Sequence, residues 1–455
     1  MPQNDAAAVA ALRQVEAELD TRWPESKIDP SLERIAALLE LLGRPQDAYP
    51  VLQIAGTNGK TSVARMLDML LGTAGLRTGR FISPHLQLAT ERISLDSHPI
   101  DLHAYLDAYR DVEPYLSIVD SESPVRLSKF EVLTAMAFAA FADAPVDAAV
   151  IEVGMGGRWD ATNTAKAKVA VITPIGVDHV EYLGNDVLGI AREKAGIIKP
   201  SSIAILAQQQ PDVAAEVLKR CTEVDATVAR QGSEFAVLER QVAVGGQQLR
   251  LQGLGGIYDE IFLPLHGEHQ AHNAALALAA AEAFFGAGRN RQLDVDAVRQ
   301  AFAEVRTPGR LEPVRSAPTV LLDAAHNPHG ARALATAMTS EFAFRRLVGV
   351  LGVMAGKDVD GILTELEPVL SEVVLTRNSS PRAMDPDELA EVAEKIFGEE
   401  RVVVRPGLDD AIETAVGLAE GAAEPDQYVT GGGVLITGSV VTAGDARLLF
   451  GREPA

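Results

Sequence analysis

Cysteine, basic residues and long apolar runs are scarce in this sequence. Cys221 is the single cysteine, which excludes an intramolecular disulfide and suggests a reducing compartment. The 41 lysine and arginine residues are outnumbered by 63 aspartate and glutamate residues, and this argues against a nucleic-acid partner, which requires a basic surface. No apolar run approaches the roughly 18 residues of a membrane span, and no basic-then-apolar segment opens the chain. We therefore expect a soluble, cytoplasmic protein that binds neither nucleic acid nor membranes.

What the chain does contain is ordinary for a soluble enzyme, with 47% hydrophobic and 23% charged residues. Its 455 residues suffice for two or three domains with cores of their own. The net charge of −22 means that any phosphate site must concentrate its cations locally. We expect small-molecule substrates and a monomeric chain.

Residues 51–62, VLQIAGTNGKTS, have the pattern of a phosphate-binding loop. A buried strand is predicted at Val51 to Ala55, before the loop, and an amphipathic helix is predicted to start near Lys60, after it. Between them, Gly56 and Gly59 allow the backbone to wrap closely around an anion at a helix N-terminus. Lys60 can reach terminal phosphates, and Thr61 can offer a hydroxyl to magnesium. The spacing departs from the strict G-x-x-x-x-G-K-[ST] form, but the strand–loop–helix order still predicts a nucleotide site.

Polar residues follow three predicted strands at the ends where open α/β sheets bind ligands. The first set lies in a tetrapeptide that by itself is more typical of a plain turn. Glu152 in the second set precedes a Gly-x-Gly-Gly-Arg-x-Asp segment, and a carboxylate in this place can hold magnesium. The strands and the residues after them are Thr78 to Ile82 with residues 83–86, Ala148 to Ile151 with residues 152–160, and Val169 to Thr173 with Asp178 and His179.

Two further segments could be functional, but each also has an ordinary structural explanation. The charges of residues 191–199 put Lys194 at the end of a helix, and their spacing alone favours ion pairing on a solvated face. His266, His269 and His272 fall at i, i+3 and i+6, which superficially suggests zinc. However, the first of them precedes a glycine and is expected to lie off the helix.

A domain boundary is predicted at residues 306–311, where a Pro-Gly pair ends a helix. Before it, residues 201–265 alternate short strands and turns, which predicts a sheet edge and a hairpin region. The predicted strands there are Ile203 to Ala207, Thr227 to Arg230, Val242 to Val244 and Leu249 to Leu251. We expect an α/β protein with a phosphate-loop domain at 1–305, built on a mostly parallel central sheet. A hinge at 306–311 leads to a smaller, doubly wound, Rossmann-like domain at 312–455. Its predicted strands are 320–323, 347–353, 373–376 and 433–437, and its predicted helices are 331–340, 358–370, 385–397 and 408–419.

The loop at residues 56–60 resembles the nucleotide loop of the Mur ligase superfamily of ATP-dependent amide-forming ligases. Within it, the chain is similar along nearly its whole length to the folylpolyglutamate synthase/dihydrofolate synthase family. Each matching segment is weak alone, but their order is specific. One departure is Thr61, where the folate branch more often has glycine. The other matching segments are residues 83–86, 152–163, 178–179, 193–200, 308–310 and 323–328.

The resemblance implies an ATP-dependent ligase that adds L-glutamate to folates and also to dihydropteroate. ATP would phosphorylate a pteroate or folate carboxylate, and the amine of glutamate would attack the acyl phosphate. Mg²⁺ is the implied cofactor, with a monovalent cation as a further candidate. Two domains closing over the ligands would exclude water from the acyl phosphate.

The resemblance also implies roles for individual residues. Lys60, Lys194 and His326 would be catalytic, and Lys194 would carry a carbamate. Lys60, Arg158, Lys194 and Arg310 are expected to converge on one cleft, which would supply the local cations. The implied ATP-binding residues are Gly56, Thr57, Asn58, Gly59, Lys60, Thr61, Ser62, Asn273, Arg310 and Asp323. The implied metal ligands are Ser83, Glu152, His179 and Thr61, and the implied substrate contacts are Phe130, Glu131, Arg158, Asp160, His326 and Asn327, although the pattern around Phe130 alone predicts a core position.

Two other interpretations remain open. A Mur ligase of cell-wall synthesis shares the loop but carries a nucleotide-sugar domain before it, for which we expect the roughly 50 preceding residues to be too few. A P-loop GTPase or non-catalytic nucleotide switch is the other interpretation, but a one-domain switch does not need a second domain that brings Arg310 and Asp323 to the nucleotide. Glutamate-dependent phosphate release would distinguish a ligase from a switch.

Overall fold

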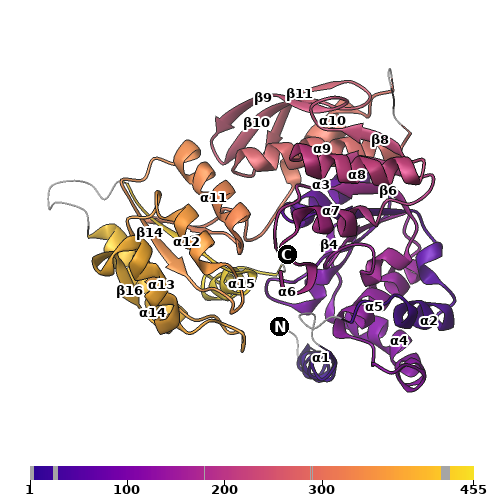
Figure 1. Ribbon diagram of the computed structural model, residues 1–455, viewed down its shortest axis with the longest axis horizontal. Helices are drawn as coiled ribbons and strands as arrows, with labels where there is room; N and C mark the ends of the chain where they lie inside the picture. The colour runs from indigo at the N-terminus through magenta and orange to yellow at the C-terminus, as the bar shows by residue number, and fades with distance from the viewer. Residues whose placement is uncertain are drawn as a thin grey trace.

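The computed structural model describes residues 5–23, 29–178, 180–286, 288, 291–421 and 431–454, and the structural statements below refer to these residues. Two α/β units, each with its own sheet, lie side by side (Figure 1). No helix in these ranges combines the length and the apolar character that crossing a membrane would require.

The first unit is built on an eight-stranded sheet with the order β4-β3-β2-β5-β1-β6-β7-β8. Its strands pair in parallel except for β2–β3 and β3–β4. The central strands are fully buried because helices cover both faces, which explains their continuous apolar runs. The strands are β1 (Val51–Ala55), β2 (Thr78–Phe81), β3 (Ile93–Leu95), β4 (His98–Pro99), β5 (Ala148–Glu152), β6 (Ala167–Ile172), β7 (Ile203–Leu206) and β8 (Thr227–Arg230).

The side chains of β1 alternate between two cores, as the period of a strand requires. Leu52 and Ile54 pack with α3, α9 and α10, whereas Val51 packs on the opposite face with α1, α2, α4 and α5. Ala55 joins a third core that holds α7 and α8. The helices are α1 (Asp5–Asp20), α2 (Glu33–Leu41), α3 (Lys60–Thr73), α4 (Leu102–Glu122), α5 (Lys129–Asp143), α6 (Val180–Leu183), α7 (Val187–Ala195), α8 (Pro211–Glu223), α9 (Glu268–Phe284) and α10 (Val295–Glu304), with 3₁₀ turns η1 (Pro45–Asp47), η2 (Ala89–Arg92) and η3 (Ala161–Thr164).

A three-stranded antiparallel sheet, β11-β10-β9, covers α9 at the top of the first unit in Figure 1. It comprises β9 (Ala236–Ala243), β10 (Gly246–Gln252) and β11 (Ile257–Leu263), and it confirms the predicted hairpin region. Val244, predicted inside a strand, lies instead in the turn after β9 and is fully exposed. β11 was not expected, because the polar pair at 259–260 breaks its apolar pattern, and Glu260 has φ +59°.

The second unit has a six-stranded sheet with the order β12-β13-β17-β14-β15-β16, parallel except for β12–β13. Helices cover both faces, which confirms the doubly wound prediction. The polar edge strand β12, the short β16 and the last helix were missed. The elements are β12 (Glu312–Ser316), β13 (Thr319–Leu322), α11 (Pro328–Glu341), β14 (Arg346–Leu351), α12 (Val359–Leu366), β15 (Glu372–Leu375), α13 (Pro386–Phe397), η4 (Glu399–Arg401), β16 (Val402–Val404), α14 (Leu408–Glu420), β17 (Gly432–Thr437) and α15 (Val440–Leu449).

Residues 309–311 of the connecting segment are bonded to the second unit. The Gly309 N–H donates to Glu312 Oε2 at 2.8 Å, and the Leu311 N–H donates to Asp323 Oδ2 at 3.0 Å. The Leu311 side chain packs in the core of the second unit. Residues 306–308 of the connection are also described, and they have no such bonds to the second unit.

A buried ion pair attaches the helix after the phosphate loop to the sheet. Arg80 Nη1 on β2 lies 2.6 Å from Asp68 Oδ2 on α3, and both side chains are almost completely excluded from solvent. The Arg80 guanidinium also donates to Ser94 Oγ at 2.8 Å. Removing one partner would leave the other charge buried without its counterion, which is far more costly than losing a surface pair.

We expect Asp68→Ala to lower the free energy of unfolding by about 3–5 kcal/mol, because Arg80 then stays buried and uncompensated. Asp107→Ala breaks the exposed Arg110–Asp107 pair and should cost less than about 1 kcal/mol. Urea denaturation followed by circular dichroism measures both. Equal losses in the two variants would contradict the importance of the buried pair.

Candidate functional site

A cavity of about 1120 Å³ lies between the two units. The first unit contributes the phosphate loop, and the second contributes the segment between β13 and α11 together with the loop after β14. Both contributions come from carboxyl ends of parallel strands, where open α/β sheets bind ligands. The lining also includes Trp23, Gln231 and His272.

The phosphate loop requires its two glycines for steric reasons. Gly56 has φ +151°, and a Cβ there would lie 1.8 Å from Oγ1 of Thr173, the residue immediately after the neighbouring strand β6. Gly59 has φ +88°, and a Cβ there would lie 2.7 Å from the Asn273 side chain. Only glycine permits this close approach. The Lys60 ammonium donates to the carbonyls of Gly56 at 3.2 Å and Thr57 at 3.1 Å, and so lies over the loop.

Hard oxygen ligands gather beside this loop. Thr61 Oγ1 lies 3.0 Å from each carboxylate oxygen of Glu152, which is buried at the end of β5. Burial raises the pKa of Glu152, while Lys60, the Thr61 hydroxyl, Arg310 and the Ser83 N–H oppose that shift. The Ser83 side chain lines the same part of the cavity. Carboxylate and hydroxyl oxygens suit magnesium, so these three residues fit the predicted metal.

The other predicted metal features have different outcomes. His179, the fourth predicted ligand, lies outside the described residues. Among the residues that are described, no group of three His, Cys, Asp or Glu side chains could hold a metal. His266 Nδ1 lies 3.1 Å from Glu341, and the His272 ring lies 2.9 Å from Gln231. Among the described residues, the three histidines thus do not form a metal-binding group.

Lys194 is buried, so the solvated ion pair that its spacing favoured is wrong. Its Nζ donates to the Gly56 carbonyl at 2.8 Å. Burial, with the nearby Lys60 charge, lowers the pKa of Lys194 to about 7. Sequence spacing could not reveal this, because the end of α7 is covered by the glycine segment after β5. A Cβ at Gly157 would lie 2.6 Å from the Glu193 carbonyl.

Arg158 does not join Lys60 and Arg310 on the cavity wall, which corrects the expectation for this residue. Lys194 is not among the lining residues either, but it is bonded to the Gly56 carbonyl of the phosphate loop. Its backbone N–H donates to the Glu193 carbonyl at 2.9 Å, and its side chain is exposed. Burial raises the pKa of Glu193, and Arg158 opposes that shift from outside the cavity. Arg158 is also absent from the cavity wall, whereas Lys60 and Arg310 line it. The predicted substrate contact through Arg158 is therefore not supported by this geometry.

The remaining predicted substrate residues of the first unit, Phe130, Glu131 and Asp160, line the cavity. Phe130 lies against Phe81, with ring centroids 5.9 Å apart, so it is both a core and a cavity residue. Glu131 accepts from the Ser128 N–H at 2.7 Å and from Arg34 Nε at 3.2 Å. Because these groups are rigidly held, they present a preformed surface.

Asp160 holds the segment after β5 in shape. Its carboxylate accepts from the backbone N–H groups of Met155 at 2.9 Å and Thr162 at 3.0 Å. Burial raises the pKa of Asp160 to about 6, although these bonds oppose the shift. Asp160 therefore organises the cavity wall that it also lines.

The predicted nucleotide residues come together from the phosphate loop, from α9 and from the second unit. Asn273 on α9 is buried against Gly59, and Arg310 and Asp323 line the cavity from the second unit. Asp323 accepts from the Leu311 and Ala325 N–H groups at 3.0 and 2.8 Å. Burial raises the pKa of Asp323, and Arg310 opposes that shift. Ser62 is buried, 3.4 Å from the Gln270 amide.

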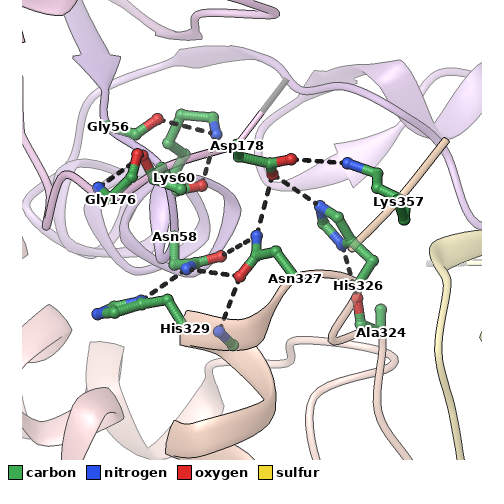
Figure 2. A network of polar contacts seen from close by, with 12 residues as sticks. Gly56, Asn58, Lys60, Gly176, Asp178, Ala324, His326, Asn327, His329 and Lys357 are labelled. Atoms are coloured by element: carbon green, nitrogen blue, oxygen red, sulfur yellow. Dashed lines mark hydrogen bonds and ion pairs between the residues drawn. The ribbon is translucent and has the colours of Figure 1, made fainter. Parts of the chain in front are cut away.

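A polar network joins the two units across the cavity (Figure 2). Asn58 and Asn327 exchange amide hydrogen bonds, both of 3.2 Å. Asp178 accepts from the Asn327 amide at 3.0 Å and from Lys357 Nζ at 2.7 Å, and His326 Nε2 lies 3.5 Å from it. The other ring nitrogen of His326 lies 2.9 Å from the Ala324 carbonyl. Of the predicted pair, Asn327 thus contacts the phosphate loop through Asn58, whereas His326 lies beside Asp178.

Lys357 was missed by the sequence reasoning. It lies in the loop after β14, at the carboxyl end of a parallel strand, and this position was the available signal. In the structure it takes the place that Arg158 was expected to fill, as a further cation on the cavity wall.

Comparisons with known proteins agree with this architecture. Residues 54–281 match the Mur ligase middle domain, and residues 309–440 match the Mur ligase glutamate ligase domain. The chain is 60% identical to a dihydrofolate synthase/folylpolyglutamate synthase of Mycobacterium tuberculosis, covering 98% of this chain and 95% of that protein.

Solved structures agree as well. Folylpolyglutamate synthase of Mycobacterium tuberculosis complexed with ADP has a TM-score of 0.95 at 59% identity, covering 98% of this chain and all of that one. Escherichia coli FolC in complex with DHPP and ADP has a TM-score of 0.83 at 29% identity, covering 99% of each chain. The chain therefore belongs to the dihydrofolate synthase/folylpolyglutamate synthase family of ATP-dependent Mur ligases.

Proposed function

We propose that the chain adds L-glutamate to folates, and also to dihydropteroate, with ATP as co-substrate. The observation that carries this proposal is the cavity shared by both units, with the phosphate loop on one wall and His326, Asn327 and Lys357 on the other (Figure 2). An acid, a nucleotide and an amine nucleophile can meet there. We further propose a cytoplasmic monomer; the monovalent cation stays a prediction.

In this proposal the first unit activates the acid. The loop N–H groups and the Lys60 ammonium stabilise the phosphoryl group as it passes from ATP to the folate carboxylate. Magnesium, when bound, neutralises charge on the phosphates, and Thr61, Ser83 and Glu152, with His179, would hold it. Asn273, Arg310 and Asp323 hold the nucleotide.

The second unit delivers the nucleophile. His326, placed by the Ala324 carbonyl and by Asp178, positions glutamate so that its amine attacks the acyl phosphate and phosphate leaves. Asn327 caps α11 through its bond to the Gly330 N–H and so fixes this wall of the cavity. Phe130, Glu131 and Asp160 bind the pterin-bearing substrate at the far end.

Enclosure completes the mechanism. An acyl phosphate hydrolyses if water reaches it, so the two units must cover it until the amine attacks. The bonds between Asn58 and Asn327 and between Asp178 and Lys357 close the cavity at this point. A one-domain nucleotide switch has no use for such contacts, which favours the ligase over that alternative.

Turnover tests the proposal directly. ADP release should require both glutamate and a folate or dihydropteroate, and Lys60→Ala should lower its rate at least about 100-fold, because no other loop residue can put a positive charge on the transferring group. Lys219→Ala, which removes an exposed lysine on α8, is the matched control and should retain full activity. Glutamate-independent hydrolysis would support a switch instead.

We also propose that the Lys194 amine adds to carbon dioxide, forming a carbamate and releasing a proton. Only the neutral amine reacts, and a pKa of about 7 leaves much of it neutral at mildly alkaline pH. The Lys194 Nζ donates to the Gly56 carbonyl, and the charges of Asp178 and Asp160 partly oppose the lowering of its pKa. The carbamate would convert this cation into a carboxylate beside the metal region.

We expect Lys194→Ala to cut turnover sharply and a short carboxylic acid such as formate to restore part of it. The same acid should not restore Lys60→Ala, whose missing group is a cation. Electron density at the Lys194 tip, in crystals grown with bicarbonate, magnesium and nucleotide, gives the direct answer. A bare ammonium there would contradict the carbamate.

A last proposal concerns domain motion at residues 306–311. Because 309–311 are bonded to the second unit, we place the pivot at 306–308. Nucleotide contacts from both units favour the closed arrangement by differential affinity. X-ray scattering should therefore give a smaller radius of gyration with a non-hydrolysable ATP analogue than without it. The hinge would be contradicted if the profiles with and without saturating analogue were identical and the profile of the free protein differed from the one calculated for the closed structure.

A further inference from the structure

Glu341 is the last residue of α11 in the second unit, yet its carboxylate is buried against the first unit. The side chain has no solvent exposure. It pairs with Arg240 on β9, lies 3.1 Å from His266 Nδ1, and accepts from the Gly267 N–H at 2.8 Å. A carboxylate at a helix end would normally remain hydrated, so its full burial here comes from contact with the other unit.

On the first unit, Arg240 and the residues around it are held in place to bind this carboxylate. Arg240 Nε donates to Gln247 Oε1 at 2.5 Å, which aims the guanidinium. The Gln247 amide in turn donates to the carbonyls of Leu265 at 2.8 Å and Gly267 at 3.1 Å. Gln247 is itself completely buried. Gln247 of the first unit thus binds the carbonyl groups of Leu265 and Gly267, and Glu341 of the second unit binds the N–H group of Gly267.

Gly267 is the residue immediately before α9, and the first turns of α9 carry cavity residues. His269, Gln270 and Asn273 all line the cavity. The Gln270 amide lies 3.4 Å from Ser62, and Asn273 is packed against Gly59 of the phosphate loop. A shift of the α9 N-terminus would therefore move side chains directly against the nucleotide loop.

The conformation at this junction is demanding. Gly267 has φ +96°, and a Cβ there would lie 2.3 Å from the His269 ring. The Glu341 carboxylate also sits at the positive end of α9, where a negative charge is favoured. The neighbouring Phe342 ring packs on His266 with centroids 4.9 Å apart, which aligns the end of α11 with the same segment. Three contacts therefore join the end of α11 to the segment before α9: Glu341 with His266, Glu341 with Gly267, and Phe342 with His266.

We propose that Glu341 is a positioning residue for the nucleoside triphosphate, acting through Gly267 and α9 from the opposite domain. The inference rests on the proposed function, because it assumes that the phosphate loop binds ATP. Docking of Glu341 sets the α9 N-terminus, and nucleotide binding against that same turn favours the docked state. Nucleotide affinity and domain closure are then coupled, and the coupling is reciprocal.

The test compares binding of a non-hydrolysable ATP analogue by calorimetry in the wild type, Glu341→Gln, Arg240→Gln and the double variant. Glutamine keeps an acceptor for the Gly267 N–H but removes the charge paired with Arg240. We expect about tenfold weaker binding in each single variant, within the usual range of coupling between sites. The double variant should be no weaker than either single one, because both remove the same interaction.

Glu420→Gln is the matched control, since it neutralises a half-exposed glutamate that faces Arg315 within the second unit. It should bind the analogue as the wild type does. Steady-state kinetics of Glu341→Gln should show KM for ATP raised about tenfold with KM for glutamate within twofold of wild type. Backbone amide hydrogen exchange at residues 266–273 should be faster in Glu341→Gln than in the wild type. Saturating ATP analogue should slow this exchange.

The outcomes separate the two levels of the proposal. If the wild type does not bind the analogue, the proposed function itself fails. If the wild type binds and Glu341→Gln binds equally well while only its melting temperature falls, the residue is merely structural and the positioning role is overturned. Arg240→Gln applies the same criterion from the other unit if Glu341→Gln does not fold.

Discussion

Two ammonium groups share one carbonyl oxygen at the end of β1, and much of the site depends on this arrangement. Lys60 and Lys194 both donate to the Gly56 carbonyl, at 3.2 and 2.8 Å. Their mutual repulsion contributes to the lowered pKa of Lys194, after burial itself. The arrangement requires Gly56, because any side chain there would overlap Thr173, the residue immediately after β6. A steric constraint between neighbouring strands thereby sets the electrostatics of the cleft.

The second constraint is that neither unit has a complete site. The first unit carries the phosphate loop and its oxygen ligands, but Arg310, Asp323, His326 and Lys357 belong to the second. Contacts across the cleft occur at separate places: around Asn58 and Asp178 near the reacting end, and around Glu341 beside α9. Because buried polar contacts are costly when half made, these places favour a fully closed arrangement over a partly closed one.

The sequence predicted most of the fold because buried parallel strands leave continuous apolar runs, and β1 was predicted with its observed bounds. Elements at edges were harder: β12 is polar, and β11 is interrupted by a positive φ at Glu260. Loop glycines and strand ends revealed the phosphate loop and Glu152. Side-chain direction was not readable, so Arg158 was expected inside the cleft and Lys194 was read as solvated from its spacing. Only the packing of α7 against the segment after β5 decides both.

The excess of acidic residues can now be related to the site. Three of the cations that line the cavity each lie near an acidic group: Lys60 near Glu152, Arg310 near Asp323 and Lys357 on Asp178. Such a site is close to balanced before any ligand enters, so anionic substrates must compete with internal carboxylates for the same cations. The competition favours ligands that satisfy several cations at once. A triphosphate and two carboxylic acids together can do this, whereas a single small anion cannot, and the selectivity of the cleft follows from its internal pairing as much as from its positive charges.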